Sequence, residues 1–170
     1  MNTVLIVEDE KMIRQGIKSM IQRSGVPVQT IIECSNGHMT IHPHGRKCFC
    51  GKEGCFEAYV SARRLSTEQD CTLDEFFSQL QQENPRFIKV FEEYLDDLTT
   101  GINNLYIMCD GNVVVGGPVA KYLVPYQDKI RRMLVEKYSF DTDGSYFSFA
   151  QCTAEQADTG AALMFLLNFC

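Results

Sequence analysis

Residues 37–59 read GHMTIHPHGRKCFCGKEGCFEAY, and this stretch holds all three histidines of the chain and three of its eight cysteines. It shows neither the alternation of a strand nor the 3.6-residue period of a helix. Something other than an apolar core must therefore hold it in shape. Four of its side chains follow the spacing His-x9-Cys-x-Cys-x4-Cys, namely His38, Cys48, Cys50 and Cys55.

One imidazole and three thiolates make a complete tetrahedral ligand set for zinc. Gly51 and Gly54 permit tight turns between the ligands. Since four protein ligands leave no open position for water, the predicted zinc site is structural rather than hydrolytic. His42 and His44 are alternatives to His38 as the imidazole ligand, and a reduced, metal-free cysteine cluster is the alternative to the whole site.

Positive charge surrounds the three cysteines. Arg46, Lys47 and Lys52 lie within the same loop, and nearby cations favour the deprotonated thiol that a metal requires. Clustered cysteines in a chain without the features of a secreted protein indicate metal binding rather than a disulfide scaffold.

Upstream of this loop, the sequence predicts a strand–helix–strand unit. Val4–Val7 is a short apolar run that suits a buried strand, and Met12–Ile21 carries apolar residues at helical spacing. Gly25 and Pro27 end that helix, and Val28–Ile32 forms the second strand. The unit predicts the start of a parallel sheet, and the fold class is α/β.

Downstream, helices and strands alternate. A short helix is expected over Glu57–Leu65, and Thr72 with Glu75 forms a capping box that starts a helix ending near Gln82. Pro85 suits the first turn of a long helix. That helix carries an apolar stripe made of Phe87, Phe91, Tyr94, Leu95, Leu98, Ile102 and Leu105. The remaining expected elements are a strand over Asn112–Gly117, a helix over Val119–Tyr138, a strand over Tyr146–Phe149 and a helix over Ala154–Phe169.

Composition narrows the classes of function. The 170 residues (19.3 kDa) are 45% hydrophobic and 22% charged, which is typical of one ordinary globular domain or two small ones. A net charge of −6 and a pI of about 5.1 exclude a general nucleic-acid or anionic-membrane binder. No apolar run approaches the roughly 20 residues that span a bilayer, and the first residues lack a signal-peptide pattern. The expected location is the cytoplasm.

The sequence resembles that of the ROK family of bacterial sugar kinases and sugar-responsive transcriptional repressors. Gly37–Ile41 and the run from Gly45 to Tyr59 match the zinc-binding signature of the family. Val113–Gly117 is similar to its strand and Gly-Gly turn on the nucleotide side, and Asp158–Ala162 to its C-terminal Gly-Ala-Ala helix. The resemblance covers residues 37–170. It implies the C-terminal half of an actin/hexokinase-like fold, with a mixed sheet flanked by helices.

The resemblance also implies roles for individual residues. His38, Cys48, Cys50 and Cys55 match the zinc ligands, and His38 also matches a residue that touches the sugar through its other ring nitrogen. Glu57 matches a carboxylate that accepts hydrogen bonds from sugar hydroxyls; the alternative is a solvated carboxylate in a first helical turn. Gly116 and Gly117 match the nucleotide-side loop, although any strand-to-helix turn uses such glycines.

Two parts of the family's kinase machinery do not occur in this sequence. It contains neither the phosphate loop Asp-x-Gly-x-Thr nor the Asn-Asp pair whose Asp is the general base. Cys34-Ser35-Asn36 stands where an acidic residue usually precedes the histidine, and no helix-turn-helix segment of a repressor is evident. Without the base and the phosphate cradle, phosphoryl transfer loses its main stabilising groups.

Residues 1–37 resemble the start of a response-regulator receiver domain. Val4–Glu10, the Met12–Ile21 helix and Ser35-Asn36-Gly37 carry the likeness. The acidic pair Glu8 and Asp9 matches the family's Mg²⁺ ligands, and a solvated strand end is the alternative. The receiver's phospho-accepting Asp and later Lys are absent. We therefore expect two truncated parts joined at Gly37: residues 1–36 and residues 37–170.

The predicted function is the zinc-stabilised, sugar-binding portion of a ROK sugar kinase or sugar-responsive regulator, not catalytic by itself. One alternative is an active ROK kinase that phosphorylates glucose or an N-acetyl hexosamine and is completed by another chain; another is a response-regulator fragment. The expected partner is a small-molecule sugar, with no membrane and no direct nucleic-acid contact. The opening unit either docks on the main sheet or lies apart, and an exposed strand edge there predicts homo-oligomers.

Overall fold

The computed structural model describes residues 2–7, 28–34, 36–109, 112–137 and 143–149. The chain divides into two compact units. The first takes residues 1–37, 105–121 and 145–170, and the second takes residues 38–104 and 122–144. None of the described helices combines the length and the apolar character that a bilayer crossing requires.

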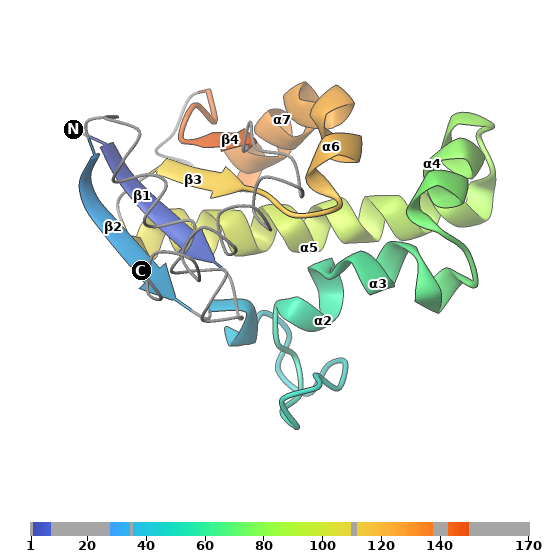
Figure 1. The fold of residues 1–170 in the computed structure, drawn as a ribbon, viewed down its shortest axis with the longest axis horizontal. Helices are drawn as coiled ribbons and strands as arrows, with labels where there is room; N and C mark the ends of the chain where they lie inside the picture. The colour runs from blue at the N-terminus through green and yellow to red at the C-terminus, as the bar shows by residue number, and fades with distance from the viewer. Residues whose placement is uncertain (1, 8–27, 35, 110–111, 138–142, 150–170) are drawn as a thin grey trace, which may run out of the picture. The chain divides into compact units, whose positions relative to one another are not determined.

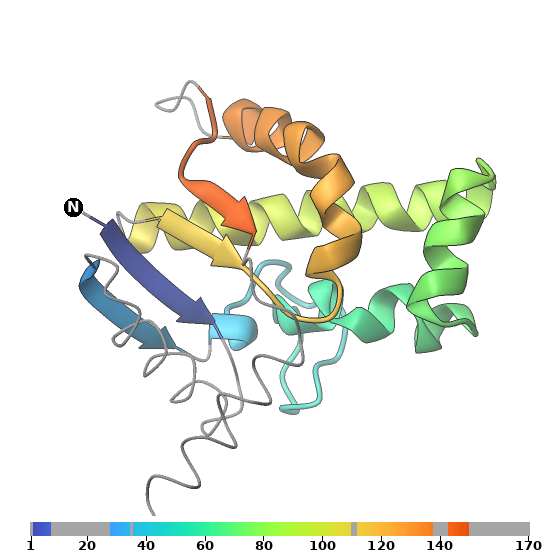
Figure 2. The ribbon, with the colours of Figure 1, turned by 45° about the horizontal axis from the view of Figure 1, so that its top comes forward.

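The first unit contains a parallel sheet of four described strands in the order β2-β1-β3-β4 (Figure 1). The strands are β1 (Asn2–Val7), β2 (Val28–Cys34), β3 (Asn112–Val115) and β4 (Phe147–Phe149). Figure 2 shows the four arrows pointing the same way. The opening strands and the later strands therefore belong to one sheet.

The register shows how the opening unit joins that sheet. β1 pairs with β2 from Asn2↔Val28 to Val7↔Cys34, and its other edge pairs with β3 at Leu5↔Val113. For the described strands of the opening unit, β1 and β2, pairing with the later strands is the alternative observed. The expectation of a mixed sheet is not met among the described strands, because all three of their pairings are parallel.

The described core of the first unit gathers around β3 and β4. Val113 and Phe147 are buried, as expected for strands of a parallel sheet, whose two faces are normally both covered. The rings of Tyr106 and Tyr146 stack with centroids 3.8 Å apart, and the amide of Val113 donates to the carbonyl of Tyr146 over 2.7 Å. β3 leads into an exposed turn at Gly117, where φ is +87°.

Most of the described helices lie in the second unit. Its elements include α2 (Glu57–Val60), α3 (Ala62–Leu65), η2 (Thr67–Gln69), α4 (Leu73–Gln81), η3 (Val124–Tyr126) and α7 (Gln127–Lys137). Two helices extend across the division between the units, namely α5 (Pro85–Cys109) and α6 (Ala120–Leu123). The short 3-10 turn η1 (Asn36–His38) precedes the histidine- and cysteine-rich loop.

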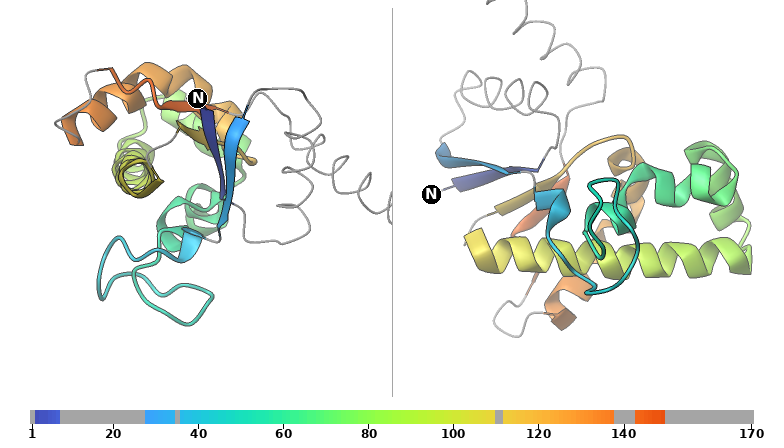
Figure 3. Two further views of the ribbon diagram at one scale, coloured as in Figure 1. Left: turned by 90° about the vertical axis from the view of Figure 1, so that its left-hand side faces the viewer. Right: turned by 90° about the horizontal axis from the view of Figure 1, so that it is seen from below.

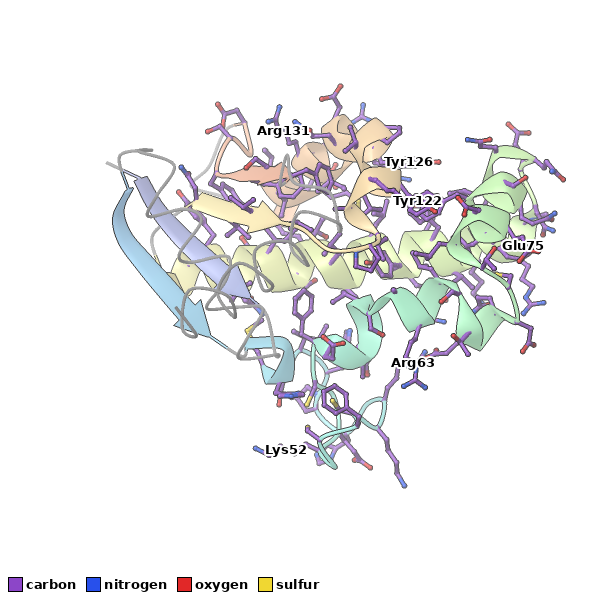
Figure 4. The ribbon with its side chains drawn as sticks, in the orientation of Figure 1. Lys52, Arg63, Glu75, Tyr122, Tyr126 and Arg131 are labelled. Atoms are coloured by element: carbon purple, nitrogen blue, oxygen red, sulfur yellow. The ribbon has the colours of Figure 1, made fainter. Side chains whose placement is uncertain are left out.

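Aromatic packing stabilises the second unit. One face of α5 buries the stripe predicted from the sequence, in particular Phe91, Tyr94, Leu95, Leu98 and Ile102. Phe77 of α4 stacks on Tyr122, with centroids 4.7 Å apart, and Phe91 packs edge-on against Tyr126. Figure 4 labels these two tyrosines where α6 and η3 meet. We call this set of buried side chains the helical core.

The predicted capping box is present at the start of α4. The amide of Glu75 donates to Thr72 Oγ1 over 3.2 Å, and the amide of Thr72 donates to the Glu75 carboxylate over 2.8 Å. Both orphan donors are thereby satisfied, which fixes the first residue of the helix.

Two predicted helices are interrupted. The helix expected over Glu57–Leu65 breaks at Ser61, whose backbone is extended (φ −64°, ψ 153°). The helix expected over Val119–Tyr138 is divided by the 3-10 turn η3, which contains Pro125. Proline has no amide hydrogen and clashes with the carbonyl one turn earlier, so the sequence held the signal for this break.

Several predicted elements lie outside the described residues. These are the Met12–Ile21 helix, the Ala154–Phe169 helix with its Asp158–Ala162 motif, and the acidic pair Glu8 and Asp9. They stay predictions.

Candidate metal centre

The loop over residues 38–56, here called the metal loop, folds back on itself (Figure 3). At its base the amide of Phe56 donates to the carbonyl of Met39 over 2.7 Å, and Thr40 and Cys55 form an antiparallel bridge. This base brings the first part of the loop, next to His38, against the last. It thereby brings together two side chains that are seventeen positions apart in the sequence.

A tight turn brings the two middle cysteines toward that base. The carbonyl of Cys48 accepts from the amide of Gly51 over 3.0 Å, and the amide of Cys48 donates to the carbonyl of Lys52 over 2.8 Å. Gly51 has a φ of +85°, which residues with a Cβ rarely adopt. Figure 4 shows Lys52 on this outer part of the loop.

The four predicted ligand atoms converge. The ligand atoms of His38, Cys48, Cys50 and Cys55 all lie within 4.8 Å of one another. His38 Nδ1 is 3.5 Å from Cys48 Sγ, and Cys50 Sγ is 3.7 Å from Cys55 Sγ.

These spacings fit a tetrahedral zinc ion. Zinc bonds of about 2.3 Å to sulfur and about 2.0 Å to nitrogen require roughly 3.8 Å between two sulfurs and roughly 3.6 Å between sulfur and nitrogen. The donor set and its spacing therefore suit zinc. Because Nδ1 of His38 is the nitrogen nearest to Cys48, Nε2 is the ring nitrogen left for another partner.

The thiols have unlike electrostatic surroundings. The pKa of Cys55 is raised to about 11, chiefly by burial and also by its contacts with Cys50 and Cys48. The pKa of the exposed Cys50 is lowered, chiefly by a hydrogen bond from the backbone amide of Lys52 and also by the charge of Lys52. A metal binding here must therefore displace a firmly held proton from Cys55, whereas Cys50 gives up its proton more readily.

The second glycine of the loop has no room for a side chain. At Gly54, φ is +78° and a Cβ would lie 1.8 Å from the carbonyl oxygen of His42. The amide of Gly54 also donates to the carbonyl of Arg46 over 2.8 Å, which closes the loop just before Cys55. Glycine is thus required sterically beside the last ligand.

The other two histidines are not part of the cluster. His42 Nε2 lies 2.5 Å from Asp97 Oδ1 on α5, and its ring packs against Tyr59 at 4.7 Å. His44 is exposed and has a φ of +61°. Among the alternatives that the sequence left open, the geometry brings His38 to the cysteines.

The remaining predicted site residues lie elsewhere. Glu57 is the first residue of α2 and is half-buried; after burial itself, its charge is the second cause that raises the pKa of Tyr94. Gly116 and Gly117 follow β3 in an exposed turn of the first unit. Of the basic residues, Arg46 is paired with Glu68 and lies over the ring of Tyr59.

The sequence did not single out the residues that receive the metal loop. Asp97 and Gly101 lie one turn apart on α5, and a Cβ at Gly101 would be only 2.2 Å from the ring of Phe56. Tyr59 Oη accepts a hydrogen bond from the amide of Arg46 over 2.7 Å. The sequence did contain one signal for this contact. Asp97 and Gly101 are spaced i, i+4 beside the apolar stripe, which puts both on one face of the helix.

Comparison with known proteins gives concordant results. The model of the ROK family matches residues 32–167. N-acetylmannosamine kinases of Haemophilus influenzae strains PittGG and ATCC 51907 are each 29% identical, over 132 and 133 residues. Each alignment covers 73% of this chain and 40% of the relative, so the chain spans about two fifths of the length of these curated relatives.

Solved structures agree with the fold. The ROK hexokinase of Thermus thermophilus matches with a TM-score of 0.58 and 27% identity, covering 75% of this chain and 46% of that one. A ROK glucokinase from Streptomyces griseus, in complex with glucose and AMPPNP, matches with a TM-score of 0.58 and 22% identity. That alignment covers 76% of this chain and 50% of the glucokinase. These likenesses support a hexokinase-like α/β fold.

Proposed function

This chain belongs to the ROK family, and from that membership we propose that it is the zinc-stabilised, sugar-binding portion of a ROK sugar kinase. The observation that carries the proposal is the convergence of one imidazole and three thiols within 4.8 Å. The relatives that match are kinases, which favours the kinase branch of the family over the regulator branch.

Zinc in this site would organise the sugar pocket rather than act on substrate. Four protein ligands complete the coordination shell, so no position is left at which the metal could activate water. A metal-bound Nδ1 fixes the tautomer of His38 and leaves Nε2–H as a donor toward a sugar hydroxyl. Zinc would thus fix the orientation of the His38 imidazole.

Glu57 is proposed as the acceptor that complements His38. It follows Cys55 by two positions and begins α2, so it comes directly after the metal loop. A carboxylate accepts hydrogen bonds from two adjacent hydroxyls, which is how proteins commonly fix a polar ligand within a pocket. His38 and Glu57 would therefore offer a donor and an acceptor to one sugar.

We propose that the chain alone does not transfer phosphate. It spans about two fifths of its kinase relatives, and its sequence contains neither the phosphate loop nor the Asn-Asp pair. Gly116 and Gly117 are the proposed nucleotide-side turn. Since β1 and β3 are adjacent and parallel, the turn lies at the sheet edge where β1 also ends, and ligands of open α/β sheets bind at that edge.

The proposal is tested by measuring zinc and sugar binding on the same preparation. We expect one zinc per chain by elemental analysis and calorimetric binding of N-acetylmannosamine or glucose to the zinc-loaded chain. Glu57→Gln should weaken sugar binding and leave zinc content unchanged. A chain that contains no zinc, or that binds sugar equally well after the metal is removed by a chelator, would contradict the proposal.

The second candidate is an active kinase completed by another chain, which the kinase relatives favour. A coupled assay of ATP consumption with N-acetylmannosamine separates the two. We expect no turnover by the purified chain. Turnover that appears only when a second polypeptide is added would favour this candidate, and turnover by the chain alone would refute the first.

A further inference from the structure

Three backbone hydrogen bonds that shape the metal loop are internal to it. The pairs Met39–Phe56, Arg46–Gly54 and Cys48–Lys52 all join one part of the loop to another. The four metal ligands likewise belong to the segment from His38 to Cys55. Metal and internal bonds therefore define the shape of the loop, but they do not determine how it is oriented on the helices of the second unit.

One buried carboxylate makes an outward contact with the loop. Asp97 of α5 is only 8% exposed, and its Oδ1 lies 2.5 Å from His42 Nε2. A buried carboxylate is costly unless it is paired and hydrogen-bonded. The His42 side chain is 46% exposed, so it reaches from solvent toward the helix.

Neighbouring contacts place this pair at the docking face. The ring of His42 packs against Tyr59, whose Oη receives the amide of Arg46, and the Arg46 guanidinium lies over the same ring and pairs with Glu68. One helical turn beyond Asp97, Gly101 makes room for Phe56. Both the early and the late part of the loop therefore rest on one face of α5.

We propose that Asp97 and His42 are positioning residues that hold the metal loop against α5 and thereby fix the direction in which His38 and Glu57 face a sugar. This inference rests on the proposed sugar-binding function. His42 is not a metal ligand, so the pair acts on orientation and not on metal affinity. Two interactions thus constrain the loop. The metal determines its internal shape, and the Asp97–His42 pair determines its orientation on α5.

The decisive experiment compares Asp97→Ala, Asp97→Asn and Glu93→Ala in the full zinc-loaded chain. Glu93 is a matched control, since it is a carboxylate on the same helix that pairs with Arg64 in a more exposed position. We expect Asp97→Ala to lower the affinity for N-acetylmannosamine or glucose about tenfold, the order expected when one hydrogen bond to a charged group is lost. Zinc content should stay at one per chain. Asp97→Asn retains a carbonyl acceptor and should restore most of the affinity.

Amide hydrogen exchange supplies a readout that does not depend on sugar. The amides of Gly45 and Gly54, which bond within the loop, should keep their protection in Asp97→Ala, because the metal maintains the internal shape. The amide of Arg46, which donates to Tyr59 outside the loop, should exchange faster. His42→Ala should reproduce this pattern.

The outcomes separate this inference from the proposed function. Equal sugar affinity in Asp97→Ala and Glu93→Ala, or loss of zinc together with affinity, overturns the positioning role. If the wild-type chain binds neither sugar, the proposed function fails. Faster exchange at Arg46 in Asp97→Ala would then still support docking of the loop, and unchanged exchange there would refute it.

Discussion

The metal loop and the helical core belong to the same unit, but the core is stabilised by apolar packing and the loop by its metal ligands. The core buries large apolar side chains, such as Phe77, Phe91 and Leu95, and the rings of Phe77 and Phe91 pack edge-on against each other. The metal loop leaves Phe49, one of its two phenylalanines, 68% accessible, and its buried side chains include the ligand cysteines Cys48 and Cys55. Where too little apolar surface is available, a folded segment needs another source of stability, and here that source is a set of ligands.

The largest effect is expected from removing one ligand. Cys50→Ser should release zinc and unfold the metal loop, because structural zinc in small sites supplies binding free energy on the order of 10 kcal/mol. Elemental analysis should show loss of the metal, and the amides of residues 40–55 should exchange rapidly. Helix α5 should remain protected.

Cys71→Ser is the matched control for that experiment. Cys71 lies outside the cluster, where its Sγ faces the carbonyls of Leu65 and Ser66. It should keep the full zinc content. If Cys50→Ser retains both zinc and the melting temperature of the wild type, ligation does not stabilise the loop.

In the helical core, the loss of a buried aromatic ring is expected to have the largest effect on stability. Phe91 is 2% exposed and packs against both Phe77 and Tyr126. Phe91→Ala should lower the free energy of unfolding by about 3–5 kcal/mol in urea titrations followed by circular dichroism. Phe49→Ala removes the same ring from an exposed position and should change it by less than about 0.5 kcal/mol. Equal losses in the two variants would erase the distinction between the regions.

The pH dependence of metal affinity is the next effect in size. Because burial and the neighbouring thiols raise the pKa of Cys55 to about 11, zinc must displace its proton throughout the neutral range. Each proton displaced makes the affinity rise about tenfold per pH unit. Titrations with a competing chelator between pH 6 and pH 8 should give tighter binding at higher pH, with release of protons. An affinity independent of pH would contradict thiol ligation.

The smallest effect belongs to the start of α4. Thr72→Ala removes the cap and should cost about 1 kcal/mol, whereas Thr72→Ser keeps the hydroxyl and should cost little. Hydrogen bonds from Thr72 lower the pKa of Glu75 below its ordinary 4.5. The stabilisation from Glu75 is therefore present above pH 4.5 and is lost as the pH falls through the lowered value. Urea titrations from pH 7 to pH 3 should show this loss in the wild type and not in Glu75→Gln.

Local signals in the sequence were sufficient for much of the fold. The apolar run Val4–Val7, the capping box at Thr72 and the long stripe on α5 each predicted the observed element, because each depends on neighbours close in sequence. The cysteine spacing likewise predicted which side chains would converge. Pro125 also carried a local signal, which the periodicity of the surrounding helix outweighed.

Contacts between distant segments could not be predicted in the same way. Nothing near His42 in the sequence indicates that its partner is Asp97, which is 55 positions away, so the sequence left His42 open as an alternative to His38 as the imidazole ligand. The pairing of β1 with β3 could not be predicted from nearby residues either, because the register of a parallel pair depends on how the whole intervening chain folds. Sequence spacing therefore predicted the metal ligands but not the residues of α5 on which the metal loop packs.

The position of β1 inside the sheet affects how the chain folds during synthesis. Leu5 pairs with Val113, so one edge of β1 has no partner until about 100 further residues have been translated. At roughly 5–20 residues per second, that interval lasts about 5–20 s on the ribosome. An unpaired apolar strand is open to association with other nascent chains for all that time. Slower elongation between β2 and β3, or a shortage of chaperones, should therefore reduce the yield of folded protein.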